Sequence, residues 1–324
     1  MHHSEIIPDP PIALAPLAGI SDLPFRDIAL KYGAGLVVSE MIASHDIVHA
    51  RQSTQAKAEL GFDRTRTAVQ IAGREAYWMA EAAKLIEGQG AKRIDINMGC
   101  PAKKVTSGQS GAALMRNEDH AISLIEAVVG ATTLPVTLKM RLGWDDSNHN
   151  APSIAAKAQN AGVRMITVHG RTRCQFYKGH ANWKAVRNVV QAVDIPVIVN
   201  GDIIDPASAK TALQHSGAAG VMVGRGTVGQ PWIIQDIAAQ LRGQATSARP
   251  DLNGLITLMI EHFQAMVEFY GPKFGIRNAR KHLSAYLLHF NVPKDYRHKM
   301  LTETDDAAVL QLIYGLDHFG LCDD

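Results

Sequence analysis

Eight short apolar runs, rich in β-branched residues, recur through the first 226 residues of this chain, and each is followed by a stretch with helical spacing. Successive runs begin 23 to 42 residues apart, enough for a strand, a loop, a helix and a return. Eight such units are the number that closes a (β/α)8 barrel. We therefore predict an α/β fold, a TIM barrel, with strands at residues 12–19, 35–40, 67–73, 93–100, 135–143, 165–171, 196–203 and 220–226.

Helix signals fill the segments between these runs. Residues 74–90 carry Ala, Leu, Ile and Glu at helical intervals and stop at two glycines. Asp205 is an N-cap candidate ahead of Pro206, and the helix that they begin would close at Gly217. Both segments predict a helix that returns the chain to the start of the next strand.

The spacing of apolar residues changes after the eighth run. From about residue 251 the chain shows amphipathic helices with little strand signal, after a polar linker at 241–254. A length of 324 residues exceeds the usual size of one domain. We predict a barrel domain at 1–243 and a small C-terminal helical domain at 244–324.

Composition describes an ordinary soluble protein, with 46% hydrophobic and 20% charged residues. No apolar run approaches the roughly 20 residues that span a bilayer, and the first ten residues resemble no signal peptide, so we expect a cytoplasmic protein without a membrane partner. Cys100, Cys174 and Cys322 are too few for a disulfide framework, and no C-x-x-C pair indicates a metal. His2 and His3 are left out of the argument.

The net charge of +2 argues neither for nor against a nucleic-acid partner, but the positions of the basic residues are informative. One acidic residue, Asp295, accompanies seven basic residues between Gly271 and Met300: Lys273, Arg277, Arg280, Lys281, Lys294, Arg297 and Lys299. Such a run is either a solvated helix face or a surface that binds phosphates.

Polar side chains follow almost every predicted strand, at the end where the strands of a TIM barrel converge on one mouth. Seven of the eight strands end in a side chain able to bond a ligand, which predicts a ligand site there. The residues at these strand ends are Ala18, Gly19, Glu40, Gln70, Asn97, Cys100, Lys139, Arg141, His169, Arg171, Asn200, Asp202, Gly224 and Arg225.

The seventh and eighth strands end in "NGDI" and "GRG", where barrels commonly hold a phosphate on backbone amides. The text "GRGTVG" matches a dinucleotide fingerprint, but it follows the eighth strand instead of the first strand of a βαβ unit. A mononucleotide with one terminal phosphate fits better. We predict flavin mononucleotide (FMN), with Gln70 as an amide partner of its ring and Lys139 as the cation near N1.

Cys100 has three interpretations at this point. It could be a structural thiol, a nucleophile that needs a lowered pKa and a nearby base, or a general acid. A free cysteine thiol, with an ordinary pKa of about 8.5, keeps its proton at neutral pH and could protonate one carbon of a double bond while a flavin gives hydride to the other. The residues alone do not rank the last two.

Six ordered motifs together resemble the tRNA-dihydrouridine synthase family, most closely its bacterial B type. They are "LAPLAGISDLPFR", "INMGCPAKKV", "VTLKMRLGWDD", "ITVHGRTRCQFYKGHANW", "IPVIVNGDI" and "GVMVGRG", and "RNARKHLSAYL" is similar to the family's helical domain. The resemblance runs from about residue 12 to residue 290. It implies an FMN-binding TIM barrel with a helical domain, which reduces tRNA uridines to 5,6-dihydrouridine with electrons from NADPH.

Position by position, the resemblance implies roles for the strand-end residues. Cys100 matches the family's donor of a proton to C5, while FMN N5 gives hydride to C6, and Leu17 stands where the family most often has methionine. The implied FMN contacts are Pro16, Leu17, Ala18, Gln70, Lys139, His169, Asn200, Gly201, Asp202, Gly224 and Arg225. Substrate contacts are expected at Asn97 and Arg171 for the uracil, and at Lys103, Lys104, Arg171, Arg173, Arg277, Arg280 and Lys281 for RNA phosphates.

The B-type resemblance also points to the D-loop uridine at tRNA position 17. Neither a metal nor an assembly larger than a monomer is expected. Three alternatives remain open: an FMN-dependent reductase or dehydrogenase of a free pyrimidine, a lyase with Lys139 as a Schiff-base nucleophile, and a non-enzymatic RNA-binding or regulatory protein. The basic helical domain argues against the first, because a free base needs no surface that binds phosphates. The lyase leaves Cys100 and the flavin contacts unexplained.

Overall fold

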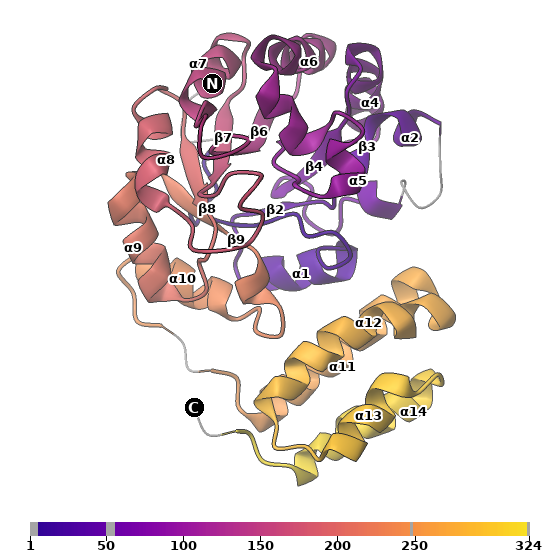
Figure 1. Cartoon of the computed structure of the whole chain (residues 1–324). Helices are drawn as coiled ribbons and strands as arrows, with labels where there is room; N and C mark the ends of the chain where they lie inside the picture. Colours follow the sequence, from indigo (N-terminus) through magenta and orange to yellow (C-terminus); the bar gives the residue numbers. More distant parts are fainter. Residues whose placement is uncertain (1–5, 50–55, 247–248, 323–324) are drawn as a thin grey trace.

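The computed structural model describes residues 6–49, 56–246 and 249–322, so His2 and His3 lie outside it. Parallel strands form a sheet in the order β2-β1-β9-β8-β7-β6-β5-β4-β3, and pairing of β2 with β4 closes eight of them into a barrel (Figure 1). The strands are β1 Ile12–Leu14, β2 Leu36–Val38, β3 Ile42–Ala43, β4 Thr67–Ala72, β5 Ile94–Met98, β6 Val136–Arg141, β7 Met165–His169, β8 Val197–Asn200 and β9 Gly220–Val223.

All eight predicted strands are confirmed, but each ends one to five residues earlier than predicted. The tails of the predicted segments form the loops at the barrel mouth, as at residues 15–19 after β1 and 201–203 after β8. The two-residue strand β3, which pairs with β4, was not predicted because so short a segment shows no alternation.

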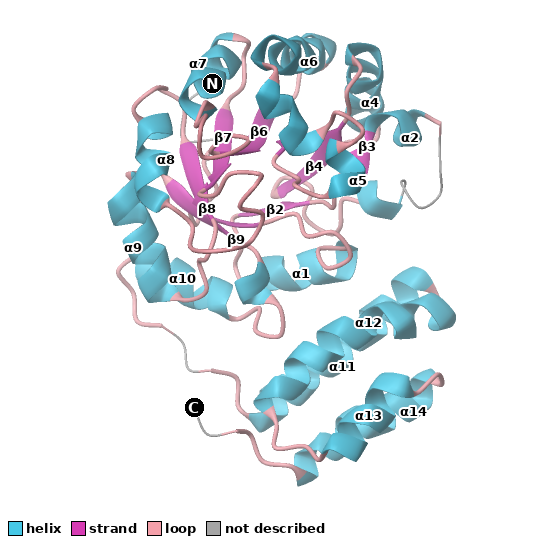
Figure 2. Cartoon of the chain, in the orientation of Figure 1, coloured by secondary structure: helices cyan, strands magenta, loops and turns pink. Residues whose placement is uncertain are grey.

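The helices around the barrel follow local signals (Figure 2). α9 begins with a capping box in which Asp205 accepts the Ser208 N–H, and it ends at Gly217 with a φ of 70°. The predicted helix at 74–90 is α4. Bounds of the elements in the barrel domain are α1 Leu23–Lys31, α2 Ser44–Val48, α4 Ala76–Gly88, α5 Lys103–Thr106, η2 Gly111–Arg116, α6 Glu118–Ala131, α7 Ala151–Asn160, α8 Trp183–Val190, α9 Pro206–Ser216, η3 Arg225–Thr227 and α10 Ile233–Leu241.

Two clusters of buried apolar side chains close one end of the barrel and leave the other end open. Most apolar strand side chains pack outward against the helices. A separate cluster fills the barrel interior near the N-terminal end of the strands, and Ile6 packs with it. Its members from the strands are Ala13, Leu36, Val38, Ala68, Met165, Ile198 and Met222. This plug leaves the other end, where the strands finish, for a ligand cavity.

The C-terminal helices form a separate unit beside the barrel, joined to it after α10, so the boundary predicted at 243–244 falls in the connection (Figure 1). α11 and α12 pack closely: a Cβ on Gly275 would lie 2.5 Å from the Val267 Cα. None of the helices in the described residues combines the length and the hydrophobicity of a membrane span. The elements are α11 Leu252–Tyr270, α12 Pro272–Tyr286, η4 Leu287–His289, α13 Lys294–Thr302, α14 Asp306–Tyr314 and η5 Gly315–His318.

Candidate active site

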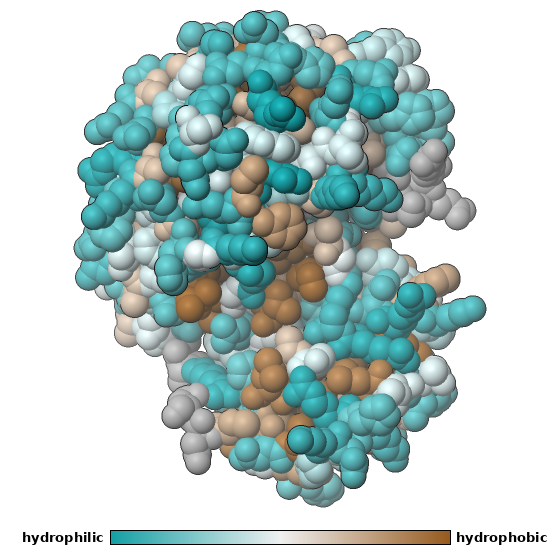
Figure 3. Space-filling view, viewed as in Figure 1, coloured by the Kyte–Doolittle hydropathy of each residue, from teal (hydrophilic) through white to brown (hydrophobic). Residues whose placement is uncertain are grey.

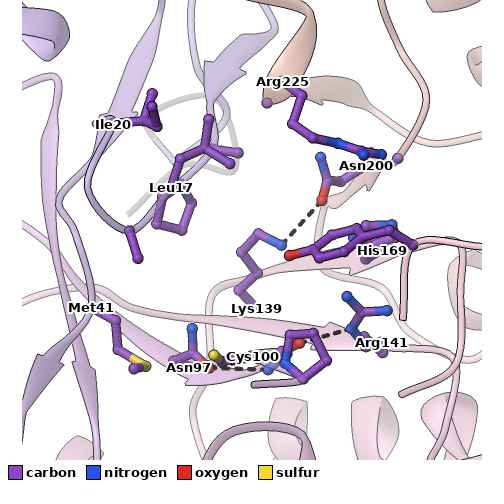
Figure 4. Close-up of a pocket in the computed structure, with 18 of the residues that line it drawn as sticks. Leu17, Ile20, Met41, Asn97, Cys100, Lys139, Arg141, His169, Asn200 and Arg225 are labelled. Carbon is purple, nitrogen blue, oxygen red and sulfur yellow. Dashed lines mark hydrogen bonds between the residues drawn. The ribbon is translucent and has the colours of Figure 1, made fainter. Parts of the chain in front are cut away.

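A cavity of about 730 Å³ opens at the strand ends, a volume typical of sites for small ligands and cofactors. Asn97, Cys100 and all eleven predicted FMN contacts line it (Figure 4). Those eleven are Pro16, Leu17, Ala18, Gln70, Lys139, His169, Asn200, Gly201, Asp202, Gly224 and Arg225. One cavity therefore brings together residues that the sequence placed at seven strand ends.

The sequence argument assigned no role to several other residues in the cavity wall. Met41, Phe176, Tyr177 and Ile204 lie in loops that carry no strand-end signal. Arg141 is a strand-end residue whose function the sequence did not indicate. The sequence signal that could have indicated Phe176 and Tyr177 is their place within the family-like motif "ITVHGRTRCQFYKGHANW".

Lys139 lies on the cavity wall but is only 8% exposed, and its Nζ donates to Asn200 Oδ1 at 3.1 Å (Figure 4). Burial, and next the charge of Arg141, lower the pKa of Lys139 from 10.5 to about 8. Burial also holds the pKa of His169 well below 6.5, with Lys139 as the next cause. Lys139, Arg141 and Arg225 line the cavity with Asp202 as their acidic neighbour, so the lining carries an excess of positive charge that favours an anionic ligand.

A chain of buried hydrogen bonds runs from Asp95 to Cys100. Gln70 Nε2 donates to Asp95 at 2.7 Å, and Asn97 Nδ2 donates to Gln70 Oε1 at 2.7 Å. Asn97 Oδ1 then accepts the N–H groups of Gly99 at 3.2 Å and Cys100 at 3.0 Å. The orientation of the Cys100 peptide is therefore fixed from inside the barrel.

The loop that follows Cys100 folds back against it. Ala112 N–H donates to the Cys100 carbonyl at 3.0 Å. A Cβ on Gly111, whose φ is 61°, would lie 2.9 Å from that carbonyl oxygen and 3.2 Å from the Cys100 Cβ, so only glycine fits without displacing Cys100. Arg141 adds a further restraint next to Cys100, because its guanidinium donates to the carbonyl of Gly99 at 2.8 Å and to that of Phe176 at 2.9 Å.

Arg171 does not line the cavity. Its guanidinium, 2% exposed, donates to Asp202 at 2.6 Å, and also to the carbonyls of Lys178 and Gly179. Burial acts to raise the pKa of Asp202, but hydrogen bonds from Arg171 and the Ala181 N–H lower it below its usual value. Asp202 itself has a φ of 53°, which an aspartate tolerates better than a bulky residue. Arg171 thus supports the loop after β8 from beneath.

The loops after β8 and β9 provide backbone N–H groups. Within the described chain, no hydrogen bond is made by the backbone N–H of Gly201, Asp202, Gly224 or Arg225. A Cβ on Gly201 would lie 2.9 Å from the Ala181 Cβ, so a side chain would crowd this loop. Unpaired N–H groups beside Arg225 are suited to a phosphate.

The cavity mouth is aromatic and cationic. Arg225 lies 4.8 Å from the ring centre of Tyr177, and Arg141 lies 5.5 Å from the same ring. Phe176, Tyr177 and Ile204 are all more than 40% exposed. Figure 3 shows hydrophobic surface gathered in the hollow between barrel and helical domain. This mouth offers flat apolar surface and positive charge to an incoming ligand.

Some predicted RNA contacts are exposed, and others are engaged with the protein itself. The exposed ones are Lys103 and Lys104 on α5, next to Cys100, and Arg277 on α12.

The remaining predicted contacts have partners within the chain or are half-buried. Arg173 stacks on Trp144 at 4.7 Å and donates to Thr106 Oγ1. Arg280 donates to the Thr302 and Glu303 carbonyls, which joins α12 to the end of α13. Lys281 is half-buried and points toward Gly19.

Comparison with known proteins identifies relatives over almost the whole chain. The family model "Dihydrouridine synthase (Dus)" matches residues 13–314. A probable tRNA-dihydrouridine synthase of Rhodobacter capsulatus is 57% identical, covering 94% of both chains. The tRNA-dihydrouridine synthase B of Vibrio vulnificus is 42% identical and covers 93% of both chains.

A solved structure of a morphinone reductase mutant in complex with tetrahydroNAD has a TM-score of 0.50 and 13% identity to this chain. The alignment covers 75% of this chain and 89% of that one, and it supports the barrel fold. The family model and the relatives confirm the resemblance that the six motifs indicated. The chain belongs to the dihydrouridine synthase family.

Proposed function

We propose that this protein reduces a D-loop uridine of tRNA to 5,6-dihydrouridine, with FMN bound in the cavity and NADPH as the electron source. The observation that carries the proposal is the position of Cys100 in the wall of the same cationic cavity as Lys139 and Arg225. A thiol held by its backbone beside a cavity for an anionic cofactor is the arrangement that proton donation to a substrate carbon needs.

The residues present fit FMN. Its phosphate would lie on the free N–H groups after β8 and β9, beside Arg225. Its ring would contact Pro16, Leu17 and Ala18 on one side and reach Lys139 and His169. When bound, FMN supplies the hydride. Lys139, already cationic below pH 8 and hydrogen-bonded to Asn200, would stabilise negative charge on the reduced ring.

The protein's own contribution to the reaction is a positioned proton. Cys100 Sγ would supply that proton, and Asn97 and Arg141 bond to the N–H and the carbonyl of the Gly99–Cys100 peptide. Asn97 uses one of its two side-chain N–H groups on Gln70, so the other remains to donate to a carbonyl of the uracil. The aromatic mouth helps to exclude water from the base.

The RNA substrate explains the exposed cations. A uridine must leave its stack to enter the cavity, which costs a few kcal/mol that contacts elsewhere must offset. Lys103 and Lys104 beside the cavity, and Arg277 on α12, can contribute phosphate contacts. Following the B-type resemblance, we propose the uridine at tRNA position 17, in the cytoplasm.

Mapping dihydrouridine in tRNA tests the proposal. A strain that lacks this protein should lose dihydrouridine at position 17 and regain it when the gene is restored. Purified protein should contain FMN and reduce that uridine with NADPH. Reduction of free uracil at the same rate as tRNA would support the free-pyrimidine reductase instead. Full dihydrouridine in the deletion strain, with RNA binding retained in vitro, would support the non-enzymatic alternative.

A further inference from the structure

Three buried side chains meet between the barrel and the helical domain, away from the cavity. Asp22 precedes α1, His262 lies on α11 and His282 lies on α12. Each is at most 3% exposed, and one potential ligand atom of each lies within 4.8 Å of the other two. The residues come from positions 240 and 20 apart in the chain, so no sequence motif joins them.

Three of the four ring nitrogens of these two histidines lack a hydrogen-bond partner in the part of the chain that the structure describes. Among the described residues, His262 Nε2 and both nitrogens of His282 have no hydrogen bond. Phe25 packs against both rings, at 5.7 Å from His262 and 5.2 Å from His282, and encloses them in apolar surroundings. A buried polar atom without a partner costs about 1–3 kcal/mol, so three in one place call for a bound group.

Two tyrosines hold the cluster from outside. Tyr286 OH lies 3.1 Å from His262 Nδ1, so Nε2 is the nitrogen of this ring that remains without a partner among the described residues. Tyr270 OH donates to Asp22 Oδ2 at 3.1 Å. Metal-binding histidines usually have the second ring nitrogen fixed by such an outer hydrogen bond, and metal-binding carboxylates are often hydrogen-bonded too.

We propose that Asp22, His262 and His282 bind a divalent transition-metal ion, zinc being the best match, with water as a fourth ligand. Two imidazoles and one carboxylate form a donor set that zinc accepts in tetrahedral geometry. Zn–N bonds of about 2.0 Å bring ligand atoms to ~3.3 Å from each other. Atoms within 4.8 Å reach that spacing by small side-chain rotations. This departs from the expectation that the chain has no metal.

Histidine binds a metal as a neutral imidazole and aspartate as a carboxylate, so the three side chains offer one negative charge to a cation. Two basic side chains lie nearby. The ammonium of Lys281 extends toward Gly19. Arg26 is buried on α1, one turn after Asp22, and its guanidinium donates to the carbonyls of Ser21 and Glu59.

A metal at this position would connect the two parts of the chain. Asp22 directly follows the loop after β1, whose residues Leu17, Ala18 and Ile20 line the cavity. Both histidines belong to the helical domain. The ion would therefore fix the orientation of α11 and α12 beside the cavity mouth, which is a structural role independent of the redox reaction.

Metal analysis of the intact FMN-bound protein tests the proposal. The protein is incubated with zinc, freed of unbound metal by gel filtration and analysed by mass spectrometry and X-ray absorption. We expect about one zinc per chain with two imidazole ligands and oxygen, and a melting temperature several degrees above that of chelator-treated protein. Absence of both bound metal and a melting shift with zinc, cobalt or manganese would overturn the proposal, and so would sulfur ligation.

Variants locate the metal within the chain. His262→Gln and His282→Gln should each reduce the zinc content at least tenfold, whereas the matched control His298→Gln, at an exposed position on α13, should retain it. If the buried variants fail to fold, the ligand set measured on the unmodified protein decides the question. Retention of zinc in folded His282→Gln protein would contradict the assignment.

Discussion

The side-chain oxygen of Asn97 accepts the backbone N–H of Cys100 at 3.0 Å, so one residue of β5 fixes the peptide that carries the candidate acid. Asn97 is itself held by Gln70, which donates to the buried Asp95. The position of the thiol therefore depends on a polar network inside the barrel as well as on the loop that carries it.

Asn97→Ala should lower turnover on tRNA by about 10- to 100-fold, because it leaves the Cys100 N–H and Gln70 Oε1 without their partner and releases the loop. Steady-state kinetics and FMN content measure the effect. Asn117→Ala is a matched control, since Asn117 also accepts a backbone N–H, that of His120, but at the start of α6. It should cost about 1 kcal/mol of stability without a change in turnover.

Cys100→Ala should retain FMN and its reduction by NADPH, yet lose about 10²- to 10⁴-fold in turnover on tRNA, because the proton donor is gone. Stopped-flow spectroscopy separates the two half-reactions. Cys174→Ala, at an exposed position outside the cavity, should behave like the unmodified protein. Full activity of Cys100→Ala would rule out the proton-donor role.

Lys139→Met should slow both flavin reduction and turnover, because the cation beside the ring is lost. In the FMN-free protein the pKa of Lys139 is lowered from 10.5 to about 8, so the unfolded state binds the extra proton between these pH values. Stability should therefore rise with pH across this window, by about 3 kcal/mol at most.

Urea unfolding of FMN-free protein at pH 8 and pH 10 measures this rise. Lys139→Met should lack it, whereas Lys184→Met, at an exposed position on α8, should keep it. An equal rise in both variants would mean that other groups cause the pH dependence.

Arg171→Met should destabilise the protein and weaken FMN binding, since it leaves Asp202 without the guanidinium that holds it at 2.6 Å. Breaking a buried pair costs about 3–5 kcal/mol, and the partial exposure of Asp202 places the expected loss at the lower end. Thermal unfolding and FMN titration measure both effects. An unchanged FMN affinity would show that the loop after β8 needs no support from Arg171.

Arg277→Ala should weaken tRNA binding several-fold and make it less sensitive to salt, as expected for the loss of one phosphate contact. Arg280→Ala should instead lower the stability of the helical domain, because Arg280 bonds the Thr302 and Glu303 carbonyls. Binding titrations at several salt concentrations, with thermal unfolding, distinguish the two. Identical salt dependence in Arg277→Ala and unmodified protein would remove Arg277 from the RNA contacts.

The sequence by itself determined the barrel, because eight alternations of an apolar run with a helical stretch admit few other closed arrangements. It also determined which strand ends carry chemistry, since parallel strands in a barrel all finish at one mouth. Lys139, Asn200 and Cys100 were placed together on that ground alone, and they line one cavity. Local signals sufficed as well for α9, where Asp205 and Gly217 mark both ends.

Only the tertiary structure decided the direction and the partners of individual side chains. Arg141 and Arg171 look alike in sequence and both are buried, yet only Arg141 lines the cavity. The paths of the loops around them set their partners: Gly99 and Phe176 for Arg141, and Asp202 for Arg171. Asp22, His262 and His282 meet only because α11 and α12 pack against the barrel. Distances across such interfaces depend on packing between distant segments, which no local pattern encodes.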